Sequence, residues 1–114
     1  MMKFLIVAIA TLTGATWVGA ETIDVKYCGQ LDLNLFACTD ITRSSFIKRA
    51  CYDKVQQFVV VQLNATYYPY CEMPAGIYAN FLAADSMGRF YNANIKSTGS
   101  NGPYDCRTHR KPTY

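Results

Sequence analysis

The residues best able to do chemistry in this chain are its five cysteines and its one histidine. The cysteines are Cys28, Cys38, Cys51, Cys71 and Cys106. Their spacings contain no Cys-x-x-Cys pair, which disfavours a zinc site or a thioredoxin-type redox pair. A nucleophilic cysteine or serine needs a base within hydrogen-bond reach, and the histidine, His109, lies in the C-terminal tail. The sequence therefore predicts no catalytic residue, no metal ligands and no cofactor.

The amino-terminal segment predicts export. Met1-Met2-Lys3 is a short positive region, residues 4–18 form an almost uninterrupted apolar run, and small residues precede Glu21. This is the pattern of a signal peptide, with cleavage between Ala20 and Glu21. An uncleaved membrane anchor is the alternative, but the apolar run is shorter than the roughly 20 residues of a spanning helix. We therefore expect a secreted or periplasmic protein that does not contact the membrane after cleavage.

Export has consequences for the cysteines and for the charge. An oxidising compartment makes disulfide bonds the expected state, and an odd number leaves one thiol over. Removal of residues 1–20 leaves 94 of the 114 residues and lowers the net charge from +3 to +2. A nucleic-acid-binding domain usually carries a stronger basic footprint. Here only the tail after Cys106 concentrates positive residues, a pattern typical of a solvated chain end.

Three consecutive strands are predicted in the middle of the chain. Their residues are mostly β-branched and aromatic, and polar turns separate them. We expect the strands within residues 44–53, 58–64 and 65–73. Because side chains alternate along a strand, Val59, Val61 and Leu63 point to one face, which we expect to be the buried one. The proline of Tyr68-Pro69-Tyr70 cannot donate to a ladder, which favours an edge strand or a bulge at that point.

Two short helices follow the strands. Pro74 reads as the first residue of a helix over 74–85, and Ser86 is a natural N-cap for a second helix. Residues 21–43 show short alternating patterns and predict an extended arm with one or two strands. Residues 97–114 form a loop and a basic tail. The predicted fold class is α+β: a three-stranded antiparallel meander with two short helices on one face and a disulfide-pinned N-terminal arm.

The meander constrains the disulfide pairing. Cys51 and Cys71 would both lie opposite about Val59, two strand spacings apart, or roughly 9–10 Å. A bridge needs Cα atoms within about 7 Å, so this pair is disfavoured. Cys38 can fold back over the first strand to meet Cys51, and Cys106 can close on Cys71 after the helices. This leaves Cys28 as the expected odd cysteine.

Several short patterns between residues 44 and 96 occur together. They are Ser44-Ser45-Phe46-Ile47, Tyr68-Pro69-Tyr70, Met73-Pro74, and Ala84-Asp85-Ser86 followed by Gly88-Arg89-Phe90-Tyr91-Asn92. Their combination resembles the KTSC domain, a module of some lysyl-tRNA synthetases that also occurs as a stand-alone bacterial protein. The family's marks are a central Tyr-x-Tyr, a proline that opens a helix, and an Ala-x-Ser-x-Gly block. The resemblance identifies this chain as a stand-alone, exported member.

The resemblance implies RNA binding, which has been suggested for the family from the synthetase context. Tyr68 and Tyr70 share a face of the third strand and can stack bases, and Arg89 and Lys96 can contact phosphates. The structural alternative is that the two tyrosines pack on Tyr78 and other rings of the helices. Export removes cytosolic RNA as a partner, and the arm lies outside the resemblance.

These observations lead to three expectations for function. The first is a non-enzymatic secreted or periplasmic binding module of KTSC type, with a protein or polymer ligand that the sequence does not identify. The ligand-binding residues would be Tyr68, Tyr70, Arg89 and Lys96. The first alternative is a nucleic-acid-binding module that uses the sheet tyrosines and scattered basic residues. The second alternative is a small secreted hydrolase or toxin-like enzyme.

Overall fold

A computed structural model describes residues 21–97 and 102–114, so the predicted signal peptide lies outside the described residues. The strands are β1 (Thr22–Val25), β2 (Gly29–Asp32), β3 (Ala37–Asp40), β4 (Ile47–Asp53), β5 (Phe58–Leu63) and β6 (Thr66–Tyr70). The helices are the 3-10 turn η2 (Leu33–Leu35), α1 (Ala75–Ala83) and α2 (Met87–Asn94). No helix within the described ranges is long and apolar enough to cross a bilayer.

The strands form one six-stranded sheet in the order β2-β1-β6-β5-β4-β3. All neighbours are antiparallel except β1 and β6, which are parallel and meet at Val25 and Tyr67. The predicted α+β class is confirmed, and β4, β5 and β6 follow one another as a meander, but the prediction of three antiparallel strands is wrong. The arm adds β1 and β2 at one side and β3 at the other. A bare meander would leave unpaired backbone groups at both edges, and the arm strands pair with them.

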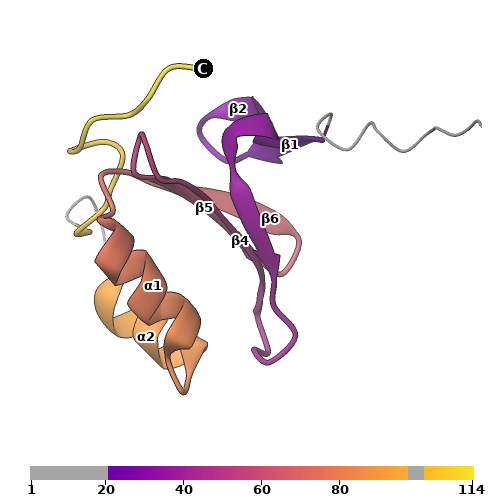
Figure 1. The fold of residues 1–114 in the computed structure, drawn as a ribbon, viewed down its shortest axis with the longest axis vertical. Helices are drawn as coiled ribbons and strands as arrows, with labels where there is room; N and C mark the ends of the chain where they lie inside the picture. Colours follow the sequence, from indigo (N-terminus) through magenta and orange to yellow (C-terminus); the bar gives the residue numbers. More distant parts are fainter. Residues whose placement is uncertain (1–20, 98–101) are drawn as a thin grey trace, which may run out of the picture.

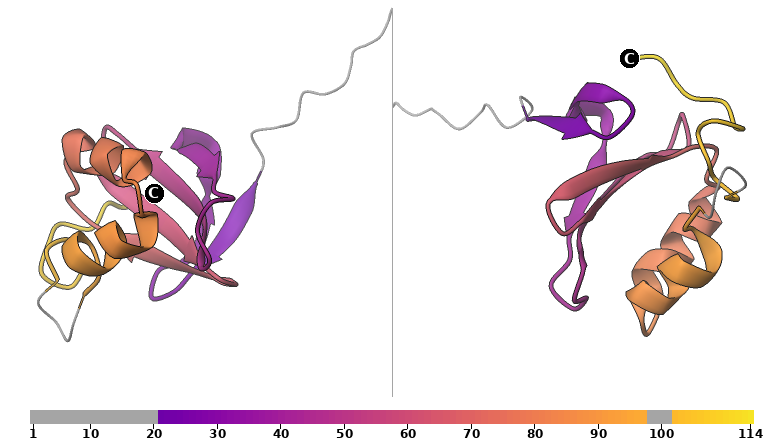
Figure 2. Two further views of the ribbon diagram at one scale, coloured as in Figure 1. Left: turned by 90° about the horizontal axis from the view of Figure 1, so that it is seen from below. Right: turned by 180° about the vertical axis from the view of Figure 1, so that it is seen from behind.

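Strand β5 lies at the centre of this fold and is buried on both faces. Val59 and Val61 belong to the cluster that packs under the helices, as expected from the alternation. Phe58 and Val60 belong to a second cluster on the opposite face. Figures 1 and 2 show why: α1 and α2 cover one face of the sheet, and the β1–β2 hairpin curls over the other. The expectation of a single buried face was therefore wrong, because the arm supplies a second apolar layer.

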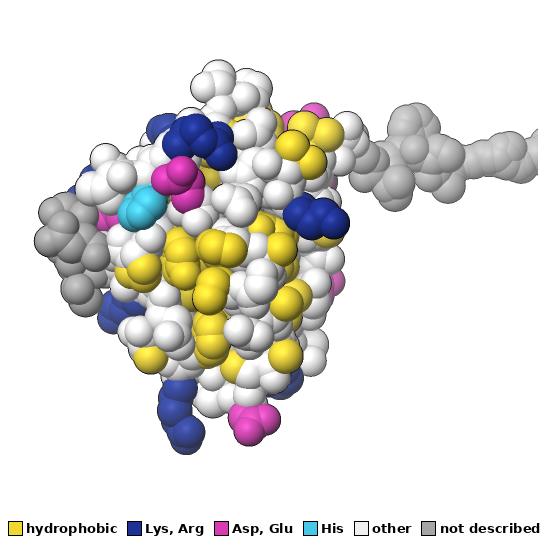
Figure 3. Space-filling view, turned by 60° about the vertical axis from the view of Figure 1, so that its left-hand side comes forward, with side chains coloured by type: hydrophobic (Ala, Val, Ile, Leu, Met, Phe, Trp, Pro, Cys, Tyr) yellow, Lys and Arg dark blue, Asp and Glu magenta, His cyan; other side chains and the backbone are white. Residues whose placement is uncertain are grey.

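The two helices begin close to where they were expected. Pro74 is the N-cap residue of α1 and not its first helical residue, and the Ser86 side chain accepts a hydrogen bond from the Arg89 amide at 3.2 Å. Arg43 ties the end of α1 to the arm, because its guanidinium donates to the Leu82 and Ala84 carbonyls, both at 2.8 Å. Helix α1 also carries exposed alanines on its outer side. Figure 3 shows hydrophobic side chains gathered on the surface at this side of the molecule.

Strand β6 is an inner strand of the sheet, but its one pair with β1 is at Tyr67, so at Pro69 it has the free edge that the proline predicts. The Tyr67 carbonyl accepts from the Lys26 amide at 2.9 Å, so the backbone groups of Tyr67 face β1. Two residues later the backbone of Pro69 faces the same way. Strand β1 has ended at Val25 by then, so the missing N–H of the proline interrupts no ladder.

The C-terminal tail is largely exposed, as expected of a solvated end, but side-chain contacts tie it to the sheet. The Arg110 amide donates to the Glu72 carboxylate at 3.0 Å, and its guanidinium reaches Gln56. Tyr114 donates to Asp53 at 2.7 Å and lies against the Phe58 ring, with 5.9 Å between ring centroids. The tail thus helps to cover the face of the sheet that lies away from the helices.

Candidate ligand-binding pocket

A pocket of about 620 Å³ opens beside β6. Tyr68, Pro69 and Tyr70 form its strand wall, and the β1–β2 turn forms a second wall with Tyr27. The end of α2 and the segment after residue 102 complete it. Four parts of the chain that are distant in sequence therefore converge on the Tyr-x-Tyr strand.

The base of the pocket is a pair of tyrosines that belongs to the core. Tyr70 is 5% exposed, and its hydroxyl shares a short hydrogen bond with the hydroxyl of Tyr91 from α2. Burial, together with this hydrogen bond, raises the pKa of Tyr70 well above its ordinary value. Burial also raises the pKa of Tyr91. Both hydroxyls therefore stay protonated and act as fixed packing groups.

Tyr68 has a different environment from Tyr70, although both lie on the helix face of the sheet. Its ring is half-buried and lines the pocket. The ammonium of Lys26 lies 5.6 Å from the centroid of this ring and 5.5 Å from that of Tyr27. The register explains the contact, because Val25 pairs with Tyr67 in parallel, which sets Lys26 level with Tyr68. Two rings of the pocket wall thus lie close to the Lys26 cation.

The remaining charges of the pocket are mostly positive. Lys96, Lys111 and Arg107 line it, together with one carboxylate, Asp105. Asp105 is 6% exposed and accepts from the Arg107 guanidinium at 2.7 Å and from the Arg107 amide at 2.8 Å. These bonds lower the pKa of Asp105. Asp105 and Arg107 therefore cancel each other in charge, and the two lysines leave the pocket basic.

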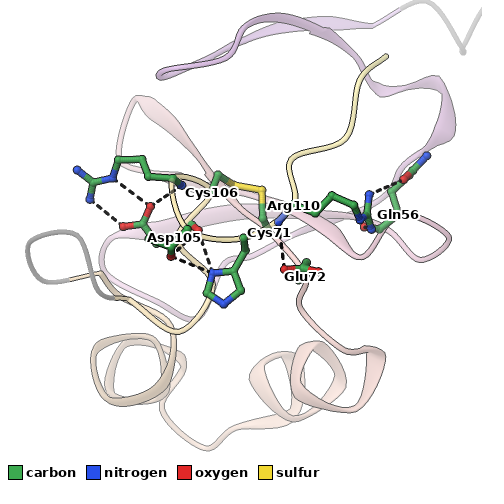
Figure 4. The surroundings of a disulfide bond; sticks show 9 residues. Gln56, Cys71, Glu72, Asp105, Cys106 and Arg110 are labelled. Carbon is green, nitrogen blue, oxygen red and sulfur yellow. Dashed lines mark hydrogen bonds and ion pairs between the residues drawn. A yellow bond between two sulfur atoms is a disulfide. The ribbon is translucent and has the colours of Figure 1, made fainter.

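The structure pairs Cys38 with Cys51 and Cys71 with Cys106, the same pairs that the sequence predicts. Cys71 follows β6 directly, and Figure 4 shows its bridge to Cys106, which ties the C-terminal segment to the end of that strand. Cys28 is the unpaired cysteine, is half-buried and lines the pocket. Burial raises the pKa of its thiol, and nearby Lys111 opposes part of that shift.

Arg89, the fourth predicted ligand-binding residue, lies elsewhere. It lines a second hollow of about 390 Å³ at the start of α2, together with Arg43 and Ser86. A Cβ atom at Gly88 would come within 2.8 Å of the Phe46 ring, so glycine lets the first turn of α2 approach that ring. The structure thus brings Tyr68, Tyr70 and Lys96 together and sets Arg89 apart.

The one histidine, His109, is engaged by neighbours in its own segment. The His109 Nδ1 atom lies 3.0 Å from the Asp105 carbonyl oxygen and 3.2 Å from Thr108 Oγ1, so local contacts engage it. Among the described residues no three His, Cys, Asp or Glu side chains are grouped so that they could hold a metal ion.

Comparisons with known proteins agree with the resemblance seen in the sequence. The sequence model of the KTSC domain family matches residues 43–98, close to the expected 44–96. A protein of Tsukamurella paurometabola is 40% identical over 55 residues, which cover 46% of this chain and 81% of that protein. The crystal structure of the KTSC domain protein YPO2434 from Yersinia pestis superposes with a TM-score of 0.52 at 28% identity, covering 55% of this chain and 89% of that one. The chain belongs to the KTSC domain family.

The family match does not extend over the whole pocket. Tyr68, Tyr70 and Lys96 lie within residues 43–98, whereas Tyr27 and Lys111 lie outside them. Sequence reasoning missed the last two residues. The signal for Tyr27 was weak: an aromatic residue in a short turn that ends at a glycine. Lys111 is brought to the pocket only because the bridge at Cys106 folds the tail back.

Proposed function

We propose that this protein is a non-enzymatic binding module of KTSC type that works outside the cytoplasm, and that its ligand occupies the pocket beside β6. The observation that carries the proposal is the pocket itself, because it lies on the Tyr-x-Tyr strand and its walls are aromatic and basic. Concave sites with apolar walls and a few polar groups are the usual form of ligand sites. The two disulfides indicate an oxidising environment, and the signal-peptide pattern supports secretion or the periplasm.

The state of the titratable groups supports binding over catalysis. A general base must be able to accept a proton near the operating pH. Asp105 is held ionised by Arg107, and the Cys28 thiol has a raised pKa, which lowers its thiolate fraction. Tyr70 and Tyr91 stay protonated. The groups at this pocket are therefore suited to contact a ligand and poorly suited to exchange protons with it.

A nucleic-acid module that stacks bases on the open sheet is less well supported. Such a platform needs exposed rings on successive positions of one face. Tyr70 lies under the helices, and Tyr67, on the opposite face, packs against the second apolar cluster. Tyr70 also lines the pocket but is only 5% exposed, so Tyr68 is the one of these three that offers an accessible ring there, which does not make a row of stacking positions.

The experiment is ligand capture from periplasmic and secreted fractions by the immobilised protein. Tyr68→Ala and Lys96→Ala are expected to reduce the retained material, whether it is protein or polymer. Arg89→Ala is the matched control, because Arg89 lies at the second hollow and its removal should leave retention unchanged. Each variant is first checked for an unchanged unfolding midpoint, which separates loss of binding from loss of fold. Equal retention by all four proteins would overturn the proposal.

A further inference from the structure

A cation lies close to two aromatic rings that line the pocket. The Lys26 ammonium lies within about 6 Å of both the Tyr27 and the Tyr68 ring centroids, the range in which a cation is attracted to an aromatic face. Tyr27 lies in the β1–β2 turn and Tyr68 in β6, so the parallel pairing of β1 with β6 creates the arrangement. The two rings offer flat apolar surface, and the ammonium between them offers positive charge.

The placement of Tyr27 is not explained by packing. Its side chain is 79% exposed, so the ring gains little from burial. Its backbone is in the left-handed region, with φ of 69°, which is unfavourable for a residue with a bulky side chain. The chain thus holds an exposed aromatic ring in a costly conformation at the pocket wall. The left-handed φ belongs to the tight turn that the Cys28 amide closes on the Val25 carbonyl at 2.9 Å, and a ring that stacks on a ligand accounts for the exposure of the side chain.

The charge of the pocket is not compensated by nearby acids. No carboxylate of the described residues lies within ion-pair distance of Lys26, Lys96 or Lys111. Asp105 is already matched by Arg107. A concave surface with one sign of excess charge attracts small ions of the opposite sign.

We propose that the pocket binds a small ligand that joins a planar ring to an anionic group, such as a carboxylate, sulfate or phosphate. This inference rests on the proposed function and names its ligand class. The ring stacks on Tyr27 and Tyr68, and the anionic group meets Lys96 and Lys111. The volume of about 620 Å³ is within the range of small-molecule sites. A bare anion leaves the rings unused, and a neutral ring leaves the lysines without a partner.

The test is a titration of the purified protein with three probes, followed by NMR. Phenyl phosphate carries both parts, inorganic phosphate carries the charge, and benzyl alcohol carries the ring. We expect phenyl phosphate to bind about tenfold more tightly than either of the others. Its affinity should fall as salt is added. Equal affinity for phenyl phosphate and benzyl alcohol, or for phenyl phosphate and phosphate, would overturn the inference.

Two variants locate the binding. Tyr27→Asn removes the ring and keeps a residue that tolerates the left-handed conformation, and Lys111→Gln removes a charge. Each should weaken phenyl phosphate about fivefold. Lys54→Gln is the matched control, because Lys54 is exposed in the turn between β4 and β5 and lines neither hollow. Tight binding that Lys54→Gln weakens as much as Lys111→Gln would place the ligand elsewhere and overturn the inference.

Cys28 gives an independent measurement inside the same pocket. The two reagents are an anionic aromatic disulfide, dithio-bis-nitrobenzoate, and a neutral one, dithiodipyridine. We expect the ratio of their labelling rates, anionic over neutral, to be higher for Cys28 than for a free model thiol. Phenyl phosphate should slow both reactions. A rate ratio no higher than that of the free thiol, with no protection, would overturn the ligand class. If the ligand class is overturned but Tyr68→Ala abolishes capture, the proposed binding function still stands. If phenyl phosphate binds but capture does not depend on the pocket, the proposed function fails and the ligand class stands.

Discussion

Two stacked tyrosines in the core offer a direct test of how this fold satisfies its buried hydroxyls. The rings of Tyr52 and Tyr78 lie 4.4 Å apart with 20° between their planes, and each residue is 7% exposed. The Tyr52 hydroxyl donates to the Met73 carbonyl at 2.6 Å. The Tyr78 hydroxyl has no hydrogen-bond partner in the described part of the chain. We therefore predict opposite effects when each hydroxyl is removed.

The magnitudes follow from the hydrogen bonds. Tyr52→Phe removes a buried bond and leaves a carbonyl without its donor, which should cost about 1–2 kcal/mol of unfolding free energy. Tyr78→Phe removes a desolvated group that gains nothing in return, which should stabilise the protein by about 1 kcal/mol. Both variants keep the stacked rings, so each is a control for the other. Urea unfolding at pH 7 without reductant measures the two midpoints.

The buried Tyr78 hydroxyl also makes the free energy of unfolding depend on pH. Burial raises the pKa of Tyr78 to about 12, whereas an unfolded chain ionises its tyrosines near pH 10. Below about pH 10 the Tyr78 hydroxyl is protonated in both the folded and the unfolded chain, so its full contribution to the free energy of unfolding is present. Between about pH 10 and 12 the unfolded state ionises first, so stability falls by about 1.4 kcal/mol per pH unit for this residue. Tyr78→Phe should therefore flatten the alkaline loss. A destabilised Tyr78→Phe variant at pH 7, or an unchanged alkaline slope, would refute the reasoning.

Three further predictions concern a disulfide, a contact at the end of α1 and a pair of buried hydroxyls. Replacing Cys71 and Cys106 by serine should cost about 4 kcal/mol by the loop-entropy relation, read from denaturant unfolding; a loss below about 1 kcal/mol would contradict a bridge that restrains the unfolded chain. Arg43→Ala should cost about 1 kcal/mol, because α1 loses its carbonyl contacts. Arg43→Lys should recover only part of the lost thermal stability, since lysine lacks the guanidinium fork, and full recovery would count against it. We expect Tyr70→Phe and Tyr91→Phe each to lower the free energy of unfolding by about 1–2 kcal/mol, and the double variant to lose less than the sum of the two. Additive losses in this double-mutant cycle would show that the two hydroxyls do not interact.

The elements that were predicted correctly depend on local rules. Strands β4, β5 and β6 follow from alternation and turn residues, and the Ser86 cap follows from its position before an amphipathic helix. The Cys71–Cys106 pairing could be predicted because the strand order excluded the other choice. Each of these needed only neighbours in the sequence or one geometric constraint.

The missed features depend on contacts that no local pattern specifies. The arm shows strand-like alternation, but nothing in Ile23 or Val25 states that their strand pairs in parallel with β6. Of the predicted binding residues, Tyr68 and Lys96 meet at one pocket while Arg89 does not, because the path of α2 separates its two ends. Lys111 reaches the pocket through a disulfide and through side-chain contacts that tie the tail to the sheet, both of which are long-range events.

The sheet order has a consequence for how the chain folds. Strands β4, β5 and β6 are joined by short turns, so their pairing closes small loops at little entropic cost. The contact between Val25 and Tyr67 closes a loop that contains all of β4 and β5, and such non-local contacts slow folding. The hairpin of β1 and β2 carries both Tyr27 and Cys28. The step that brings the turn wall of the binding pocket to β6 is therefore also the loop closure with the highest entropic cost among the strand pairings.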